Sequence, residues 1–67
     1  MIHLTVNGKP EQIQRPMSVA ELLRTVEVPQ NYLAVEVNEQ VVAREDHERV
    51  TVGEGDRVEV VTLVGGG

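Results

Sequence analysis

One stretch of this 67-residue chain has the periodicity of a helix, and it lies between segments that alternate like β-strands. Its apolar residues fall at i, i+3, i+4 and i+7, which places them on a single face. These residues are Val19, Leu22, Leu23 and Val26. Pro29 is expected to end the helix near Val28, because the residue before a proline is disfavoured in the α conformation. A helix of about ten residues is marginal alone in water, so this one must pack on a sheet.

The start of the helix carries two signals. Ser18 and Glu21 have the S-x-x-E spacing of a capping box, in which the serine side chain caps the first turn. Met17 precedes the cap and can pack on Leu22 as a hydrophobic staple. The helix is therefore expected to begin directly after Ser18.

The residues before the helix have the pattern of a β-hairpin. The first strand alternates with period two, and its apolar positions are Ile2, Leu4 and Val6. Asn7-Gly8 follows, which is the strongest short hairpin signal because a type I′ turn needs positive φ at both positions. The returning strand is expected from Lys9 to Arg15, with Ile13 as its core residue. Pro10 suits the start of a strand or the edge of a sheet.

Further strand-like segments follow the helix. The third strand has alternating apolar positions at Leu33, Val35 and Val37. Val41-Val42 is either another short strand or a plug of the core, and Val50 to Val52 is a short extended piece. The segment from Arg44 to Arg49 is almost wholly charged and is expected to be a solvated loop.

The last strand is expected from Arg57 to Val64, after a turn at Gly53 to Asp56 that contains two glycines. One face of it carries Val58, Val60, Thr62 and Val64, and the other carries Arg57, Glu59, Val61 and Leu63. Apolar residues thus lie on both faces of its second half. Either the strand is central in the sheet, or Val61 and Leu63 face a partner protein, and both can hold.

A hairpin, a crossover helix and further strands within so short a chain fit few topologies. The right-handed crossover rule places the helix on one face of the sheet and the third strand parallel to a hairpin strand. We therefore predict an α+β fold of the β-grasp (ubiquitin-like) class, with a mixed sheet of four to five strands wrapped on one helix. Residues 1–64 would form this domain, and residues 65–67 a flexible glycine tail.

The glycine tail follows the last strand directly. Glycine cannot pack a core and loses more conformational freedom on ordering than any other residue. Three glycines make a thin thread that can enter a narrow active site and present its carboxylate for activation. A frayed end or a remnant of cloning is the alternative. We expect Gly67 to carry the reacting carboxylate, and the residues expected to contact a partner are Val61, Leu63, Val64, Gly65 and Gly66.

Composition excludes several classes of function. The chain has no cysteine, so it has no disulfide, thiolate nucleophile or cysteine zinc site. His3 and His47 lack the spacing of metal ligands, and no metal site is expected. The six basic residues are scattered and the net charge is −5, which argues against nucleic-acid binding. The acidic surface either favours a partner with a basic patch or only keeps a small protein soluble. The sequence shows neither a signal peptide nor a long apolar stretch, so we expect a soluble, cytoplasmic protein without membrane contact.

Three motifs stand in the order and spacing of a known family. They are Ser18 to Leu23 at the helix start, Leu33 to Arg44 with its V-N-x-x-V-V pattern, and Gly55 to Val61 running into Val64-Gly65-Gly66-Gly67. Together they resemble the sulfur carrier proteins of thiamine biosynthesis, the ThiS family, over essentially the whole chain. Two positions depart from the family pattern. Ala43 stands where the family often has proline and His47 where it often has tryptophan, and both are expected to alter a loop.

The resemblance implies a carrier and not an enzyme. An E1-like adenylyltransferase would use ATP to convert the Gly67 carboxylate into an acyl-adenylate, and sulfur from a cysteine persulfide would then replace AMP. Thiazole synthase would take the sulfur from the resulting thiocarboxylate. The carrier itself would bind no cofactor, since ATP is used by its partner. The residues agree on one point: without cysteine, the terminus is the plausible place to hold sulfur.

Other functions stay open at this point. The small subunit of molybdopterin synthase has the same tail chemistry, but such subunits tend to be longer and richer in phenylalanine, which this chain lacks. A carrier for another sulfur pathway and a ubiquitin-like modifier joined to lysines also fit the tail. A β-grasp interaction module with an inert tail would tolerate loss of Gly67.

Overall fold

A five-stranded mixed sheet frames the molecule in the computed structural model, which describes residues 1–29 and 31–62. Its strands are β1 (Ile2–Val6), β2 (Lys9–Ile13), β4 (Ala34–Val37), β5 (Gln40–Val42) and β7 (Arg57–Val61). The order across the sheet is β2-β1-β7-β4-β5. β1 and β7 are parallel, and the other neighbours are antiparallel. β7, the strand nearest the tail, is therefore central, as one of the two interpretations of its sequence required.

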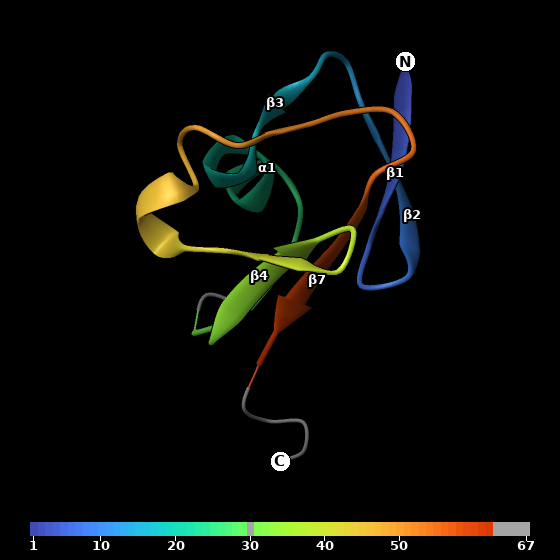
Figure 1. Cartoon of the computed structure of the whole chain (residues 1–67). Helices are drawn as coiled ribbons and strands as arrows, with labels where there is room; N and C mark the ends of the chain where they lie inside the picture. The colour runs from blue at the N-terminus through green and yellow to red at the C-terminus, as the bar shows by residue number, and fades with distance from the viewer. Residues whose placement is uncertain (30, 63–67) are drawn as a thin grey trace.

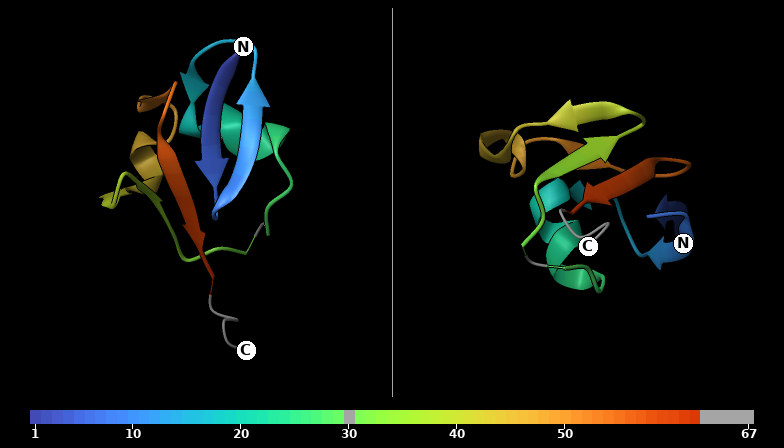
Figure 2. Two further views of the ribbon diagram at one scale, coloured as in Figure 1. Left: turned by 90° about the vertical axis from the view of Figure 1, so that its right-hand side faces the viewer. Right: turned by 90° about the horizontal axis from the view of Figure 1, so that it is seen from below.

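One helix covers one face of this sheet, as the sequence predicts (Figures 1 and 2). It is α1 (Val19–Thr25), and it lies in the crossover connection from β2 to β4. β4 runs in the same direction as β2, although β1 and β7 lie between them. A second, two-stranded sheet joins β3 (Met17–Ser18) to β6 (Thr51–Val52), and a short 3-10 helix, η1, spans Arg44–Asp46.

The first hairpin turns where the sequence places its turn. Asn7 and Gly8 have φ of 55° and 80°, as a type I′ turn requires. Pro10 lies in β2, an edge strand, where its missing N–H does no harm. β2 ends at Ile13 and not at Arg15, because Ile13 pairs with Ile2 at the very start of β1 and no partner strand continues beyond it.

The helix begins as predicted. The Ser18 hydroxyl accepts a hydrogen bond from the Glu21 backbone N–H at 3.0 Å, which satisfies one of the open donors of the first turn. The Glu21 carboxylate accepts a hydrogen bond from the Arg15 guanidinium at 2.7 Å. Met17 and Leu22, the predicted staple pair, are both buried in the core cluster.

The helix is shorter than its apolar stripe suggested. It ends at Thr25 and not near Val28, since Val26 is already extended with φ −100° and ψ 159°. Val26 and Val28 still pack against the core from this extended segment, half-buried. Valine branches at Cβ and is well suited to extended backbone, so burial of this stripe does not require a third helical turn.

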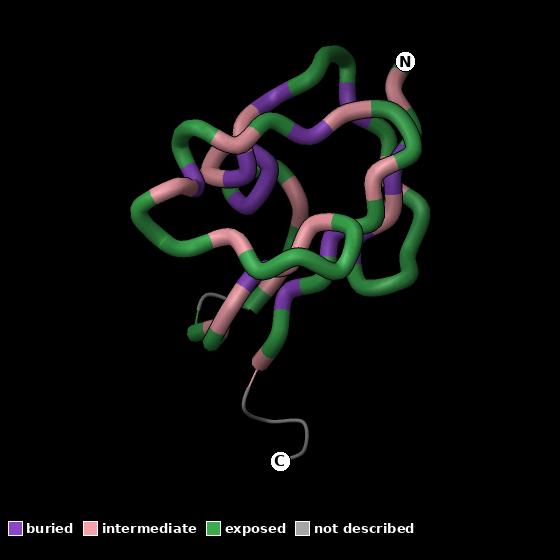
Figure 3. The backbone as a smooth tube through the Cα atoms, viewed as in Figure 1, coloured by how far each residue is buried: buried purple, intermediate pink, exposed green. Residues whose placement is uncertain are grey.

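The core lies between α1 and the inner face of the sheet. Figure 3 marks the buried residues along the backbone. Its fully buried side chains are Val19, Leu22, Val35, Val52 and Val58. The core also includes Leu4, Val6, Ile13, Leu23 and Val60. The predicted apolar face of the helix thus packs on the sheet and closes one side of the core.

The charged segment from Arg44 to Arg49 is not a plain solvated loop. It contains η1, and His47 within it is buried with 7% exposure. The His47 ring centroid lies 6.1 Å from that of Tyr32, and the Arg44 guanidinium lies 4.6 Å from the Tyr32 centroid. The His47 carbonyl accepts from the Ala20 N–H at 2.9 Å, which ties the segment to the start of the helix.

The structure corrects the expected start of the third strand and decides between the two alternatives for Val41-Val42. β4 begins at Ala34, and Leu33 before it is 57% exposed and lies outside the core. Val41 is 68% exposed within β5, so Val41-Val42 forms a strand and not a plug. The turn between β4 and β5 has positive φ at Asn38 and Glu39, and the sequence pattern did not predict this turn.

Candidate functional site

β7 separates its two faces as the alternation predicts. Val58 and Val60 are buried at 0% and 6% exposure, and Glu59 and Val61 face away from the helix. Val61 is 38% exposed on this uncovered face. The predicted contacts Leu63, Val64, Gly65 and Gly66, and the predicted reacting residue Gly67, lie outside the described residues.

Register places several side chains around Val61 on the uncovered face of the sheet. Ala34 pairs with Val61 and Glu36 with Glu59 across β4 and β7, and Val41 pairs with Glu36 across β4 and β5. Partners in a register point to the same face, because side chains alternate along each strand. We call this group the outer-face patch: Ala34, Glu36, Val41, Glu59 and Val61.

The outer-face patch is apolar and acidic. Val41 and Val61 are among the exposed large hydrophobic residues of the described chain. Glu36 and Glu59 stand directly opposite each other, and among the described residues neither has a salt-bridge partner within 4.0 Å. Like charges directly opposite on a sheet are destabilising. A partner with a cation at this place would therefore relieve a repulsion that the isolated domain retains.

The end of β7 is held from both sides. The Val60 N–H donates to Asn7 Oδ1 at 2.7 Å, and the Leu33 N–H donates to the Val61 carbonyl at 2.7 Å. These two bonds fix the last described strand where the chain runs on toward its glycines. The sequence pattern predicts Asn7 only as a turn residue, and Leu33 only as a strand residue. The amide side chain of Asn7 is the one feature of the sequence that points to its contact with β7.

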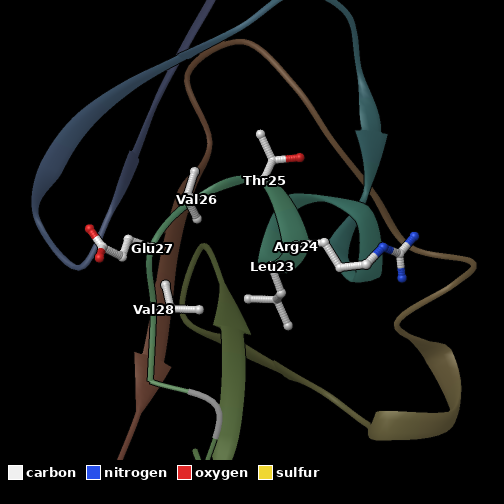
Figure 4. Close-up of a pocket in the computed structure, with 6 residues that line it drawn as sticks. All are labelled: Leu23, Arg24, Thr25, Val26, Glu27 and Val28. Carbon is white, nitrogen blue, oxygen red and sulfur yellow. The ribbon is translucent and has the colours of Figure 1, made fainter.

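A hollow of about 460 Å³ lies at the end of α1, lined by Leu23, Arg24, Thr25, Val26, Glu27 and Val28 (Figure 4). The Arg24 and Glu27 side chains point to opposite sides in this view, so they form no acid–base pair.

Over residues 1–29 and 31–62, no cluster of three or more histidine or acidic side chains could hold a metal ion. In the same part of the chain, no helix is long and apolar enough to cross a membrane.

The family model of ThiS matches residues 4–67, which is nearly the whole chain. This protein belongs to the ThiS family. A crystal structure of the thiamine biosynthesis protein ThiS from Geobacter metallireducens superposes with a TM-score of 0.83 at 42% identity, covering 98% of this chain and 100% of that one. The solution structure of a thiamine biosynthesis protein from the same organism gives 0.74, also at 42% identity, with 98% and 88% covered. The β-grasp prediction is thereby confirmed.

Two curated relatives extend the comparison. A thiazole synthase from Paramagnetospirillum magneticum is 34% identical over 64 residues, which are 96% of this chain but 20% of that protein. This ThiS family chain thus spans only a fifth of that relative. An uncharacterised protein from Porphyra purpurea is 29% identical over 66 residues, 98% of this chain and 93% of its own length. The ThiS family consists of small sulfur carrier proteins, and family and structural neighbours together associate this chain with thiamine biosynthesis.

Proposed function

We propose that this protein carries sulfur for the thiazole ring of thiamine as a thiocarboxylate on Gly67. An E1-like enzyme joins the Gly67 carboxylate to the α-phosphate of ATP, and pyrophosphate leaves. The acyl-adenylate then has AMP as a good leaving group, which a bare carboxylate lacks. Residues 1–64 serve as the body that partners recognise, and residues 65–67 as the thread that enters their active sites.

The sulfur steps of this proposal also fall to partner proteins. A cysteine persulfide attacks the Gly67 carbonyl carbon and displaces AMP, which leaves an acyl disulfide. Reduction of that disulfide by a thiol releases the thiocarboxylate. The chain has no cysteine, so both the persulfide and the reducing thiol must come from other proteins or from small thiols. This chain is therefore a co-substrate, and catalysis belongs to the enzymes that act on it.

Family membership carries the proposal, and a relative supports its last step. A segment 34% identical to this chain occurs within a protein named thiazole synthase, of which it makes up a fifth. A carrier and the enzyme that consumes its sulfur would gain from such a covalent connection, because it raises their effective concentration. This observation favours thiazole synthase as the recipient over the enzymes of other sulfur pathways.

The outer-face patch is the docking surface in this proposal. A glycine thread alone offers little area, and specific interfaces generally bury more than about 1,000 Å². The patch lies on β7, on its neighbour β4 and on β5 beyond β4, so a partner that holds the tail can cover it at the same time. Its apolar centre at Val61 and the opposed Glu36 and Glu59 suit a partner that offers an apolar contact beside a cation.

Release of pyrophosphate tests the first step of the proposed function. The protein is incubated with ATP and a ThiS-type adenylyltransferase, and pyrophosphate is measured against a chain that lacks Gly67. The full chain should release pyrophosphate, and the shortened chain should release none while keeping its melting temperature. Equal release from both chains would contradict the assignment of the reaction to Gly67.

A further inference from the structure

Asn7 does more at the end of β7 than make a turn. β1 and β7 are parallel, and their ladder begins with hydrogen bonds from the Thr5 N–H to the Asp56 carbonyl (3.1 Å) and from the Asn7 N–H to the Val58 carbonyl (2.8 Å). The next group along β7 that faces β1 is the Val60 N–H. By then β1 has ended at Val6 and the backbone has turned at Asn7.

The Asn7 side chain supplies the acceptor that the turning backbone cannot. Its Oδ1 lies 2.7 Å from the Val60 nitrogen, in a partly buried bond between residues far apart in sequence. The ladder is thereby extended along β7 after β1 has stopped. On the side of β7 that faces β4, the Leu33 N–H donates a hydrogen bond to the Val61 carbonyl at 2.7 Å. β7 is thus fixed from two sides at Val60 and Val61, its last two residues.

Asn38 offers an internal comparison at the other end of the same strand. Asn38 also has positive φ, 52°, and its Oδ1 accepts from the Arg57 N–H at 2.9 Å. One asparagine therefore caps the first residue of β7, and another caps its end. The two residues share backbone conformation, side-chain chemistry and target strand. Their bonds differ in position, since Asn38 bonds Arg57 at the start of β7 and Asn7 bonds Val60 near its end. Asn38 also donates from its side-chain amide to Asp56 Oδ1 at 3.0 Å.

We propose that Asn7 is a positioning residue for the C-terminal carboxylate, an inference that rests on the proposed function. Its bond to Val60 holds the end of β7 in the sheet, and so raises the fraction of molecules in which the point where the chain leaves β7 is placed for the adenylating enzyme. When only a fraction of molecules is competent to bind, apparent affinity falls in proportion to that fraction. Loss of the bond should therefore raise KM, while kcat stays the same once the partner holds the tail.

Substitution by glycine separates the bond from the turn. Asn7→Gly keeps a residue that accepts positive φ and removes the side-chain acceptor. Asn7→Asp keeps an acceptor oxygen and a residue that tolerates the left-handed conformation. Asn38→Gly removes the equivalent bond at the far end of β7, together with the bond from Asn38 Nδ2 to Asp56 Oδ1, and is the control. For each variant we would measure the melting temperature and the KM and kcat of ATP-dependent adenylation.

The expected result is specific to Asn7→Gly. A single hydrogen bond is worth about two- to tenfold in an equilibrium, so KM should rise about two- to tenfold with kcat unchanged. Asn7→Asp should restore the KM of the natural chain. Asn38→Gly should leave KM unchanged although its melting temperature falls at least as far, because it loses two side-chain bonds. An unchanged KM in Asn7→Gly, or an equal rise in Asn38→Gly, would overturn the proposal.

Amide hydrogen exchange provides a second measurement that needs no enzyme. The Val60 amide should exchange about two- to tenfold faster in Asn7→Gly than in the natural chain, and Asn7→Asp should protect it again. Unchanged exchange at Val60 would overturn the positioning bond itself. If the natural chain were not adenylated at all, the proposed function would fail, whereas the exchange rates would still decide whether Asn7 holds the end of β7.

Discussion

Leu22 is the residue on which the fold depends most directly. It is fully buried, it is the largest of the fully buried side chains, and it joins the helix to the sheet. Leu22→Ala should lower the free energy of unfolding by ~2–5 kcal/mol, because it removes buried methyl groups and leaves a cavity. Urea denaturation checks this, with Leu33→Ala as the control. Leu33 is 57% exposed, so its loss should cost less than about 0.5 kcal/mol.

Val61 is the residue that tests the docking surface. It lies on the uncovered face of β7 with 38% of its surface exposed. Val61→Ser should slow adenylation, because it removes the apolar centre of the outer-face patch, and should leave the melting temperature close to that of the natural chain. Thr5→Ser changes the same face at β1, away from the patch, and should leave adenylation unchanged. Parallel loss of stability and rate in Val61→Ser would instead mark Val61 as a residue of the core.

Single residues also show where sequence reasoning stops. Ile13 and the helical leucines were predicted to be core residues because periodicity alone marks the buried face. His47 was assigned to a solvated loop because its neighbours are charged, yet it is buried beside Tyr32. That contact joins segments separated along the chain, and local composition carries no information about it. The roles of Asn7 and Leu33 at the end of β7 depend on register in the same way.

Among the elements, the helix has a start that can be tested by removing one side-chain oxygen, the hydroxyl of Ser18. The Ser18 hydroxyl caps the Glu21 N–H. Ser18→Ala should lower the free energy of unfolding by about 1 kcal/mol, because a donor of the first turn loses its acceptor. Thermal or urea unfolding checks this, and Ser18→Asp should recover most of the loss. An unchanged stability in Ser18→Ala would show that solvent satisfies this donor equally well.

Long periodic elements were predicted well, and the shortest ones only in part. The short extended piece expected at Val50 to Val52 contains β6, whereas β3 was not expected. The first hairpin, the helix and the central strand have several residues of clear pattern or a diagnostic turn, and the existence of each is confirmed. The last strand ends at Val61, however, so Thr62 lies outside it, and the expected positions 63 and 64 lie outside the described residues. The pair β3 and β6 has too few residues for any periodicity and exists because Met17 meets Val52 in the folded chain. The end of the helix was misplaced for a related reason: valines at Val26 and Val28 bury equally well from extended backbone.

At the scale of the whole molecule, the β-grasp class followed from element order, whereas the strand order did not. A hairpin before a single crossover helix leaves few folds for so short a chain. The insertion of the last strand between β1 and β4 is what makes β7 central, and it is a tertiary pairing that no local pattern specifies. That insertion also places Glu59 and Val61 of β7 beside Glu36 and Ala34 of β4 in the outer-face patch.

The central claim is that the Gly67 carboxylate becomes a thiocarboxylate. The most direct measurement is the intact mass of the protein after incubation with the adenylyltransferase, ATP and a persulfide donor with a reducing thiol. The mass should increase by one exchange of oxygen for sulfur, and fragmentation should place the change at Gly67. A chain lacking Gly67, or one extended beyond it, should show no change. An unchanged mass in the natural chain despite pyrophosphate release, or sulfur found on any other residue, would contradict the account.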